Sequence, residues 1–194
     1  MEIPVQLIVF SIPSIIYFFL RKKSLNRNDL FTNLGFTFPS LKYFVFAIGV
    51  AAISILITYL VLLEFKINFA EYKNTNFDRY KNYNFSIASI FVVFLREMIY
   101  TALGEEIFFR GYIGGLLFRK FNFYVANIFQ TLIFLLPHLL LLFISVKLLP
   151  FLLTVLVSGW LLGWLRYKSY SILPGLLAHS LANTFAASMV MQYS

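Results

Sequence analysis

Long apolar stretches separated by short polar segments run along almost the whole chain. A stretch of about 18 or more apolar residues can cross a hydrocarbon core of roughly 30 Å as a helix. The pattern predicts six such spans, at residues 3–20, 43–63, 85–118, 122–144, 149–165 and 171–191. The third is too long for one straight crossing, so we expect it to tilt, kink or break, most simply near Gly104 or Gly111.

Composition favours a membrane protein over a soluble domain. Of the 194 residues, 60% are hydrophobic and 12% are charged, whereas soluble domains carry roughly 25% charged residues. The chain has no cysteine, which excludes disulfides, thiolate metal sites and a Cys nucleophile. The expected fold is all-α. It is a polytopic transmembrane helix bundle of about six spans, formed by a single domain over residues 1–194, with an intramembrane polar cavity.

The positions of Lys and Arg indicate how the spans are oriented. With both termini outside, nine basic residues fall near inner loops and five near outer loops, as the positive-inside rule favours. The net charge of +8 also suits contact with anionic headgroups of the lipid bilayer. Nucleic-acid binding is not expected, because the basic residues divide between two faces and form no single patch. The start "MEIPVQLIVF" lacks the basic region of a signal peptide, so we expect the first span to be retained.

Two polar segments interrupt the apolar pattern. Residues 24–41 contain several polar side chains, and residues 65–84 interleave Asn, Tyr and charged side chains. Such aromatic interleaving is typical of the tyrosine belt at a headgroup boundary. Both segments are therefore interpreted as loops or interfacial segments, and residues 65–84 as a solvated interfacial loop.

Glu105, Glu106 and Arg110 place three charges inside the third span. An ionised side chain near the bilayer centre costs at least about 2.5 to 3.5 kcal/mol on insertion scales, so such residues are usually paired and often functional. Glu106 and Arg110 are four positions apart and share a helix face, which predicts an ion pair. Glu105 points about 100° away from Glu106 and needs another polar neighbour or a water-filled pocket.

Both histidines of the chain lie in predicted spans. His138 follows Phe134 by one helical turn, and His179 precedes Asn183 by four residues on the same face. A single histidine on an apolar helix is more often structural than catalytic. Two histidines together with an unpaired glutamate and an asparagine favour a functional site, because imidazole and carboxylate groups bind metals or activate water.

These residues form three ordered motifs on successive apolar segments, namely Glu105-Glu106-x-x-x-Arg110, Phe134-x-x-x-His138 and His179-x-x-x-Asn183. Together they resemble the CPBP family of intramembrane proteases. That family includes the CAAX prenyl endopeptidases and bacterial proteins linked to bacteriocin processing or self-immunity. The resemblance covers roughly residues 86–190, which would form the catalytic core.

The resemblance implies an endopeptidase that cleaves a membrane-associated or lipidated peptide. Glu105 would be the base that activates a water, with His138 beside it, while His179 and Asn183 would stabilise the oxyanion or hold the water. Glu106 and Arg110 would form a structural ion pair. No cofactor is required, but Glu105, His138 and His179 could also ligate zinc, although the usual helical signature HExxH is absent. The location would be the cell membrane if the source is prokaryotic.

Two other functions remain open at this point. A protein of the same fold could act as a non-catalytic immunity or scaffold protein. A small proton- or ion-coupled transporter could also use such charges as a relay, although the chain shows no repeated halves. Arg96 and Glu97 are interpreted mainly as another buried pair that could line the same cavity, and Gly159 with Gly163 as a helix-packing motif.

Overall fold

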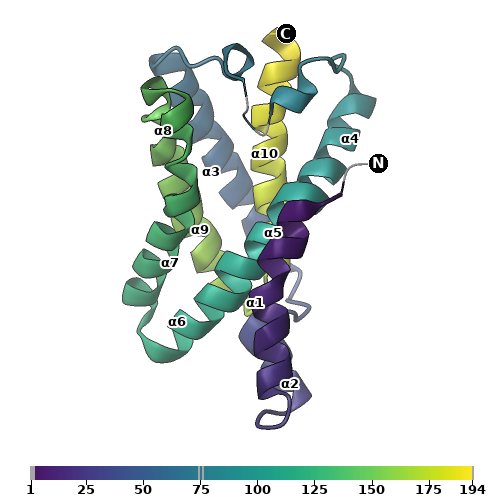
Figure 1. Cartoon of the computed structure of the whole chain (residues 1–194), viewed down its shortest axis with the longest axis vertical. Coiled ribbons are helices and arrows are strands. Elements are labelled where there is room, and N and C mark those ends of the chain that lie inside the picture. Colours follow the sequence, from purple (N-terminus) through teal and green to yellow (C-terminus); the bar gives the residue numbers. More distant parts are fainter. Residues whose placement is uncertain (1–2, 74, 76, 194) are drawn as a thin grey trace.

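The computed structural model describes residues 3–73, 75 and 77–193, and it shows a bundle of tilted helices (Figure 1). No strand occurs among these residues. The longer helices are α1 (Val5–Arg21), α2 (Arg27–Leu34), α3 (Lys42–Glu64), α4 (Ile87–Glu97), α7 (Phe123–His138), α9 (Phe151–Ser169) and α10 (Leu173–Tyr193). The shorter elements are α5 (Leu103–Glu105), α6 (Gly115–Lys120), α8 (Leu141–Ile144) and the turns η1 (Phe69–Glu71), η2 (Asp78–Tyr80) and η5 (Val146–Leu148). The predicted all-α membrane bundle is confirmed.

Three helical segments are long and apolar enough to cross a membrane, namely Lys42–Glu64, Ile87–Lys120 and Phe123–Ile144, and α1 is a shorter apolar helix. Helices α9 and α10 occupy the predicted spans 149–165 and 171–191, but polar side chains lower their mean hydropathy. Helix α10 packs against α3, α4 and α9, and Arg166 of α9 and His179 of α10 are buried there. With its many large apolar side chains exposed on α1 and α3, the chain is an integral membrane protein.

The third predicted span is one continuous 34-residue helix from Ile87 to Lys120. It runs obliquely across the bundle in Figure 1, so tilt accommodates its length. It contains two π-helical stretches, η3 (Met98–Ala102) and η4 (Glu106–Gly114), on either side of α5. Such widened turns are frequent at functional sites, and here they flank Glu105.

Glycines of this helix serve close packing and do not break it. A Cβ atom on Gly104 would lie 2.9 Å from the Leu7 Cα of α1, and one on Gly111 would lie 2.8 Å from the Leu34 carbonyl oxygen of α2. The predicted interruption near these glycines is therefore a pair of π-helical stretches, while the glycines let α1 and α2 approach.

The predicted packing role of Gly159 and Gly163 is confirmed. A Cβ atom on Gly159 would lie 3.1 Å from the Phe134 ring, and one on Gly163 would collide with the Asn127 side-chain oxygen. Both neighbours belong to α7, so these glycines allow α7 and α9 to lie close together. This contact holds Phe134 against the interior.

Both polar segments fold onto the bundle to a larger extent than expected. Residues 24–41 include α2, whose final carbonyl groups at Thr32 and Asn33 each accept a hydrogen bond of 3.0 Å from the buried Arg166. In the segment 65–84, Phe69 and Tyr80 are buried. The expectation of a solvated interfacial loop at 65–84 is wrong for these side chains, because they pack against α10 and its neighbours.

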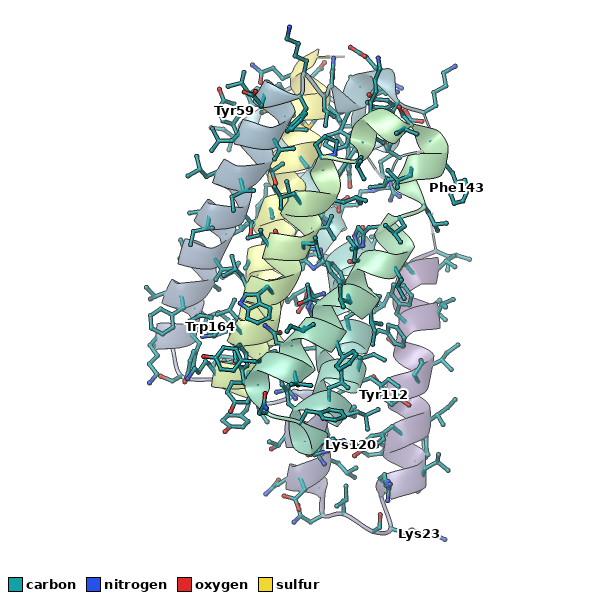
Figure 2. The ribbon with its side chains drawn as sticks, turned by 90° about the vertical axis from the view of Figure 1, so that its left-hand side faces the viewer. Lys23, Tyr59, Tyr112, Lys120, Phe143 and Trp164 are labelled. Atoms are coloured by element: carbon teal, nitrogen blue, oxygen red, sulfur yellow. The ribbon has the colours of Figure 1, made fainter. Side chains whose placement is uncertain are left out.

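The order of the helices is compatible with the predicted topology. The last turns of α10 lie at the upper end of the bundle in Figure 1, α1 begins above its middle, and α2 and α6 lie toward the lower end. In Figure 2, Lys23 and Lys120 mark the end opposite Tyr59. Which end faces the outside stays a prediction.

Candidate active site

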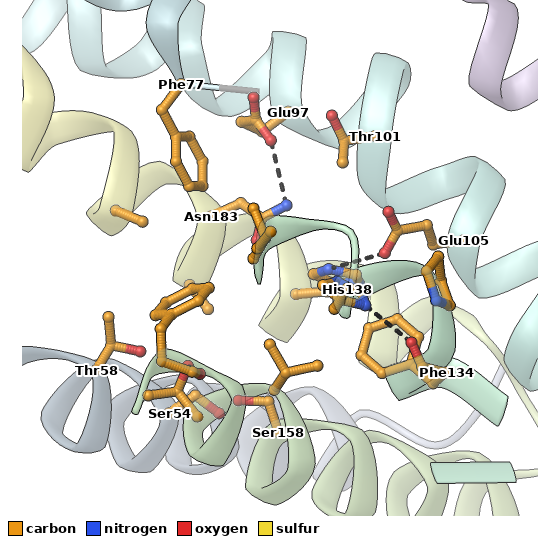
Figure 3. A pocket seen from close by; sticks show the side chains of 18 of the residues that line it. Ser54, Thr58, Phe77, Glu97, Thr101, Glu105, Phe134, His138, Ser158 and Asn183 are labelled. Atoms are coloured by element: carbon orange, nitrogen blue, oxygen red, sulfur yellow. Dashed lines mark hydrogen bonds and ion pairs between the residues drawn. The ribbon is translucent and has the colours of Figure 1, made fainter. Parts of the chain in front are cut away.

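A cavity of about 490 Å³ lies inside the bundle, and all four predicted catalytic side chains line it: Glu105, His138, His179 and Asn183. Figure 3 shows three of them, with residues from α3, α4, α9 and the 65–84 segment completing the walls. The volume lies in the usual range for small-ligand sites, roughly 300 to 1,000 Å³. The structure therefore brings three separate helical segments to one polar interior site.

Glu105 lies at the end of α5, directly before the π-helical stretch η4, and only 6% of it is exposed. One carboxylate oxygen, Oε1, accepts a hydrogen bond of 2.6 Å from the side-chain amide of Gln6 on α1. The other, Oε2, lies 3.6 Å from His179 Nε2. Glu105, for which the sequence pattern gave no partner, thus lies between the Gln6 amide and the His179 imidazole.

Glu106 forms the predicted ion pair, with 3.3 Å between its Oε1 and Arg110 Nη1, and both side chains are fully buried. Oε1 also lies 3.0 Å from His179 Nδ1. The description of Glu106 and Arg110 as a separate structural pair is therefore incomplete, because Glu106 also orients His179. The guanidinium carbon of Arg110 lies 3.9 Å from the centre of the Phe134 ring, a cation–π contact.

His138, at the end of α7, has its Nδ1 atom 2.8 Å from the Phe134 carbonyl oxygen. A carbonyl oxygen can only accept a hydrogen bond, so Nδ1 carries the proton and a neutral His138 has Nε2 as an acceptor. The Phe134 ring centre is 4.6 Å from the His138 ring and 6.0 Å from the His179 ring. Phe134 is thus the common packing surface of both imidazoles.

Asn183 is held by Glu97, which the sequence pattern placed mainly in a pair with Arg96. Glu97 is almost fully buried, with 1% of its surface exposed. Its Oε2 accepts a hydrogen bond of 3.2 Å from the Asn183 amide. Its Oε1 accepts a hydrogen bond of 2.7 Å from the Tyr80 hydroxyl. Burial, reinforced by the charge of Glu97, raises the pKa of Tyr80, so this hydroxyl stays protonated and can donate. Arg96 instead places its guanidinium over the Tyr100 ring. Glu97 therefore acts as a support for Asn183.

The sequence pattern would allow Glu105, His138 and His179 to supply three ligands for zinc. Within the described part of the chain, no three His, Asp or Glu side chains are gathered closely enough to hold a metal ion. Glu105 Oε2 and His179 Nε2 lie 3.6 Å apart, and both histidines turn Nδ1 toward an oxygen acceptor, as metal-bound histidines commonly do. The three side chains do not form a closed ligand set, and the zinc ligands stay a prediction.

Comparison with protein families matches residues 87–185 to the type II CAAX prenyl endopeptidase Rce1-like family. This match covers half of the chain. The chain belongs to this family. Neither the curated proteins nor the solved structures that were compared gave a significant match.

Membership of the Rce1-like family places the chain among CAAX protease-like intramembrane proteases. The matched segment contains all three motifs, whereas Gln6 and Tyr80 lie outside it. Sequence reasoning missed both of these residues. Gln6 left a trace, because it is the only amide side chain in the first apolar span. Tyr80 left none, because it is one of several tyrosines in a polar segment.

Proposed function

We propose that the chain is an intramembrane endopeptidase that hydrolyses a peptide bond in a membrane-associated or lipidated peptide, with a water activated by Glu105. The observation that carries this proposal is the 3.6 Å separation of Glu105 Oε2 and His179 Nε2 inside a cavity whose other walls are mostly apolar. A water can hydrogen-bond to both atoms from beside the line that joins them, at about 2.8 Å from each.

The hydrogen-bond network favours this role for both side chains. His179 Nδ1 faces the Glu106 carboxylate and therefore carries a proton, which leaves Nε2 of the neutral ring as an acceptor. A water between two acceptors donates both of its protons to them and directs its oxygen lone pairs toward a substrate carbonyl. In this proposal Glu105 takes the proton of the water, while His179 holds the water in place; the Gln6 amide fixes the other oxygen of the carboxylate.

In the proposed reaction, the water oxygen forms a bond to the carbonyl carbon while its proton passes to Glu105. The carbonyl oxygen becomes an oxyanion, which the Asn183 amide stabilises with the N–H that Glu97 does not bind. The C–N bond then breaks, and Glu105 returns the proton to the leaving amine. His138 adds an acceptor, Nε2, to the same cavity.

A direct test compares peptides released from membranes that contain the wild type, Glu105→Gln or Asn183→Ala. Glu105→Gln should abolish release, and Asn183→Ala should lower turnover about ten- to a thousandfold, as removal of an oxyanion donor does. The matched control is Glu64→Gln, because Glu64 is exposed at the end of α3 and lies away from the cavity. It should behave as the wild type.

Other outcomes would favour the alternatives. Release that is equal for the wild type and Glu105→Gln would favour an immunity or scaffold role, and proton or ion flux in proteoliposomes would favour a transporter. Incubation with a chelator should leave the rate unchanged. Loss of activity that zinc restores would instead support the zinc mechanism.

A further inference from the structure

Three hydroxyl side chains form one wall of the central cavity. Ser54 and Thr58 belong to α3 and Ser158 belongs to α9, two helices that pack against each other. In Figure 3 these side chains lie on the opposite side of the pocket from Glu97 and Glu105. The set of Ser54, Thr58 and Ser158 is called the hydroxyl wall below.

The hydroxyl groups of this wall have no partner in the protein. Serine and threonine inside apolar helices usually donate to a backbone carbonyl of their own helix, as Thr154 on the same cavity does to Phe151. Within the described part of the chain, the hydroxyls of Ser54, Thr58 and Ser158 form no hydrogen bond. Ser54 is 3% exposed and Thr58 is 7% exposed. Because an unpaired buried hydroxyl is unfavourable, these groups point to a polar ligand in the cavity.

The spacing of Ser54 and Thr58 fits the backbone of an extended peptide. The two residues are four positions apart in α3, so their side chains share one face and recur about 6 Å along the helix axis. In an extended chain, backbone groups that point to the same side recur every two residues, or about 6.6 Å. A hydroxyl both donates and accepts, so each one can pair with a backbone N–H or C=O group.

The rest of the cavity offers a peptide backbone few partners. Large apolar side chains such as Phe69, Phe77 and Phe151 can surround the side chains of a peptide, but they cannot satisfy its N–H groups. Leaving those groups unpaired in an apolar site opposes binding. Glu105 and His179 are reserved for the water in the proposed reaction. The hydroxyl wall is therefore suited to hold the backbone beside the bond that is cleaved.

We propose that the hydroxyl wall binds the main chain of an extended peptide while the peptide bond to be cleaved lies against Glu105 and His179. This inference rests on the proposed function and adds a set of positioning residues to it. A helical segment gains nothing from the wall, because its N–H groups already bond to its own carbonyls. The wall thus favours an unwound segment of a membrane-associated peptide.

Binding of capped trileucine and its backbone esters tests this inference. The parent probe is N-acetyl-trileucine amide. Each of three analogues replaces one leucine by the corresponding hydroxy acid, which exchanges a backbone N–H for an oxygen that cannot donate. Affinities are measured calorimetrically with the full-length wild type, and with Glu105→Gln to exclude hydrolysis, against empty micelles as the blank. At least one ester should bind about two- to tenfold more weakly than the parent, as the loss of one hydrogen bond predicts.

A double-mutant cycle between probe and protein assigns this difference to the hydroxyl wall. Ser54→Ala/Thr58→Val should weaken binding of the parent and remove the difference between the parent and that ester. Ser54→Ala alone is the milder variant and should narrow the difference for one ester. The matched control is Thr154→Val, because the Thr154 hydroxyl already donates to Phe151. It should keep the wild-type difference.

Several outcomes would overturn the inference. These are equal binding of the parent and all three esters, a difference that persists in Ser54→Ala/Thr58→Val, and no binding of any probe. Variants of the wall that bind every probe as tightly as the wild type would show that the hydroxyls hold only water. Failure of the proposed function is separate, since it appears as peptide release that does not depend on Glu105.

Discussion

The buried ion pair between Glu106 and Arg110 supports a quantitative prediction about stability. Glu106→Gln keeps the shape of the side chain but removes the charge that faces the guanidinium at 3.3 Å. The Arg110 nitrogen atoms Nε, Nη1 and Nη2 have no hydrogen-bond acceptor within the described part of the chain. After the substitution, this cation keeps its contact with the Phe134 ring at 3.9 Å.

Removing one partner of a buried ion pair costs about 3 to 5 kcal/mol, because the other charge stays buried without compensation. With roughly 2 to 4 °C per kcal/mol for a chain of this size, the thermal midpoint should fall by roughly 6 to 20 °C. The double variant Glu106→Gln/Arg110→Met removes both charges and should recover much of this loss. Asp78→Asn, which breaks the partly exposed pair with Lys81, should cost only about 0 to 1 kcal/mol.

The assay is thermal unfolding of the purified variants in one detergent, followed by tryptophan fluorescence and by the monodisperse fraction after size-exclusion chromatography. A Glu106→Gln variant that unfolds at the wild-type temperature would refute the reasoning. So would a double variant that is less stable than Glu106→Gln alone.

Three further predictions follow from other contacts. Gly163→Ala should destabilise the protein, because the added Cβ would collide with α7. Gly49→Ala should be neutral or stabilising, since no neighbouring helix lies within 4 Å of its added Cβ. Thermal unfolding followed by tryptophan fluorescence measures both. Tyr80→Phe should lower turnover about three- to tenfold, because it removes the hydroxyl that donates to Glu97. Tyr83→Phe, which changes a neighbouring ring, should keep the wild-type turnover. Wild-type turnover of Tyr80→Phe would contradict the role of Glu97 as a support for Asn183. Tags at both termini should be cleaved by protease added outside intact cells, and a protected C-terminus would reverse the topology.

The sequence predicted the class of fold and four residues that line the central cavity, because both depend on local patterns. Apolar length sets the helices, and the i, i+4 spacing of Glu106 and Arg110 sets their pairing. The convergence of the site was harder to predict. Helical rise alone puts His138 about 24 Å and His179 about 12 Å along their spans, yet both rings pack on Phe134. Helix tilt and packing are tertiary properties that this arithmetic does not contain.

Supporting residues could not be predicted for a similar reason. Gln6 meets Glu105 across 99 positions of the chain, and this contact depends on the close approach of α1 at Gly104. Tyr80 reaches Glu97 only because the 65–84 segment folds onto α10. The segment's polar, aromatic composition suits an interfacial loop equally well, so composition alone gave the wrong interpretation of its burial.

The most direct test of the account uses one peptide that the wild type releases from membranes. Its cleavage rate is measured in proteoliposomes that contain equal amounts of folded wild type or Glu105→Gln. The account predicts that Glu105→Gln is inactive while it keeps the wild-type melting temperature to within a few degrees, because a glutamine can still bond to Gln6 and remain close to His179. Cleavage by folded Glu105→Gln at the wild-type rate would contradict the central claim.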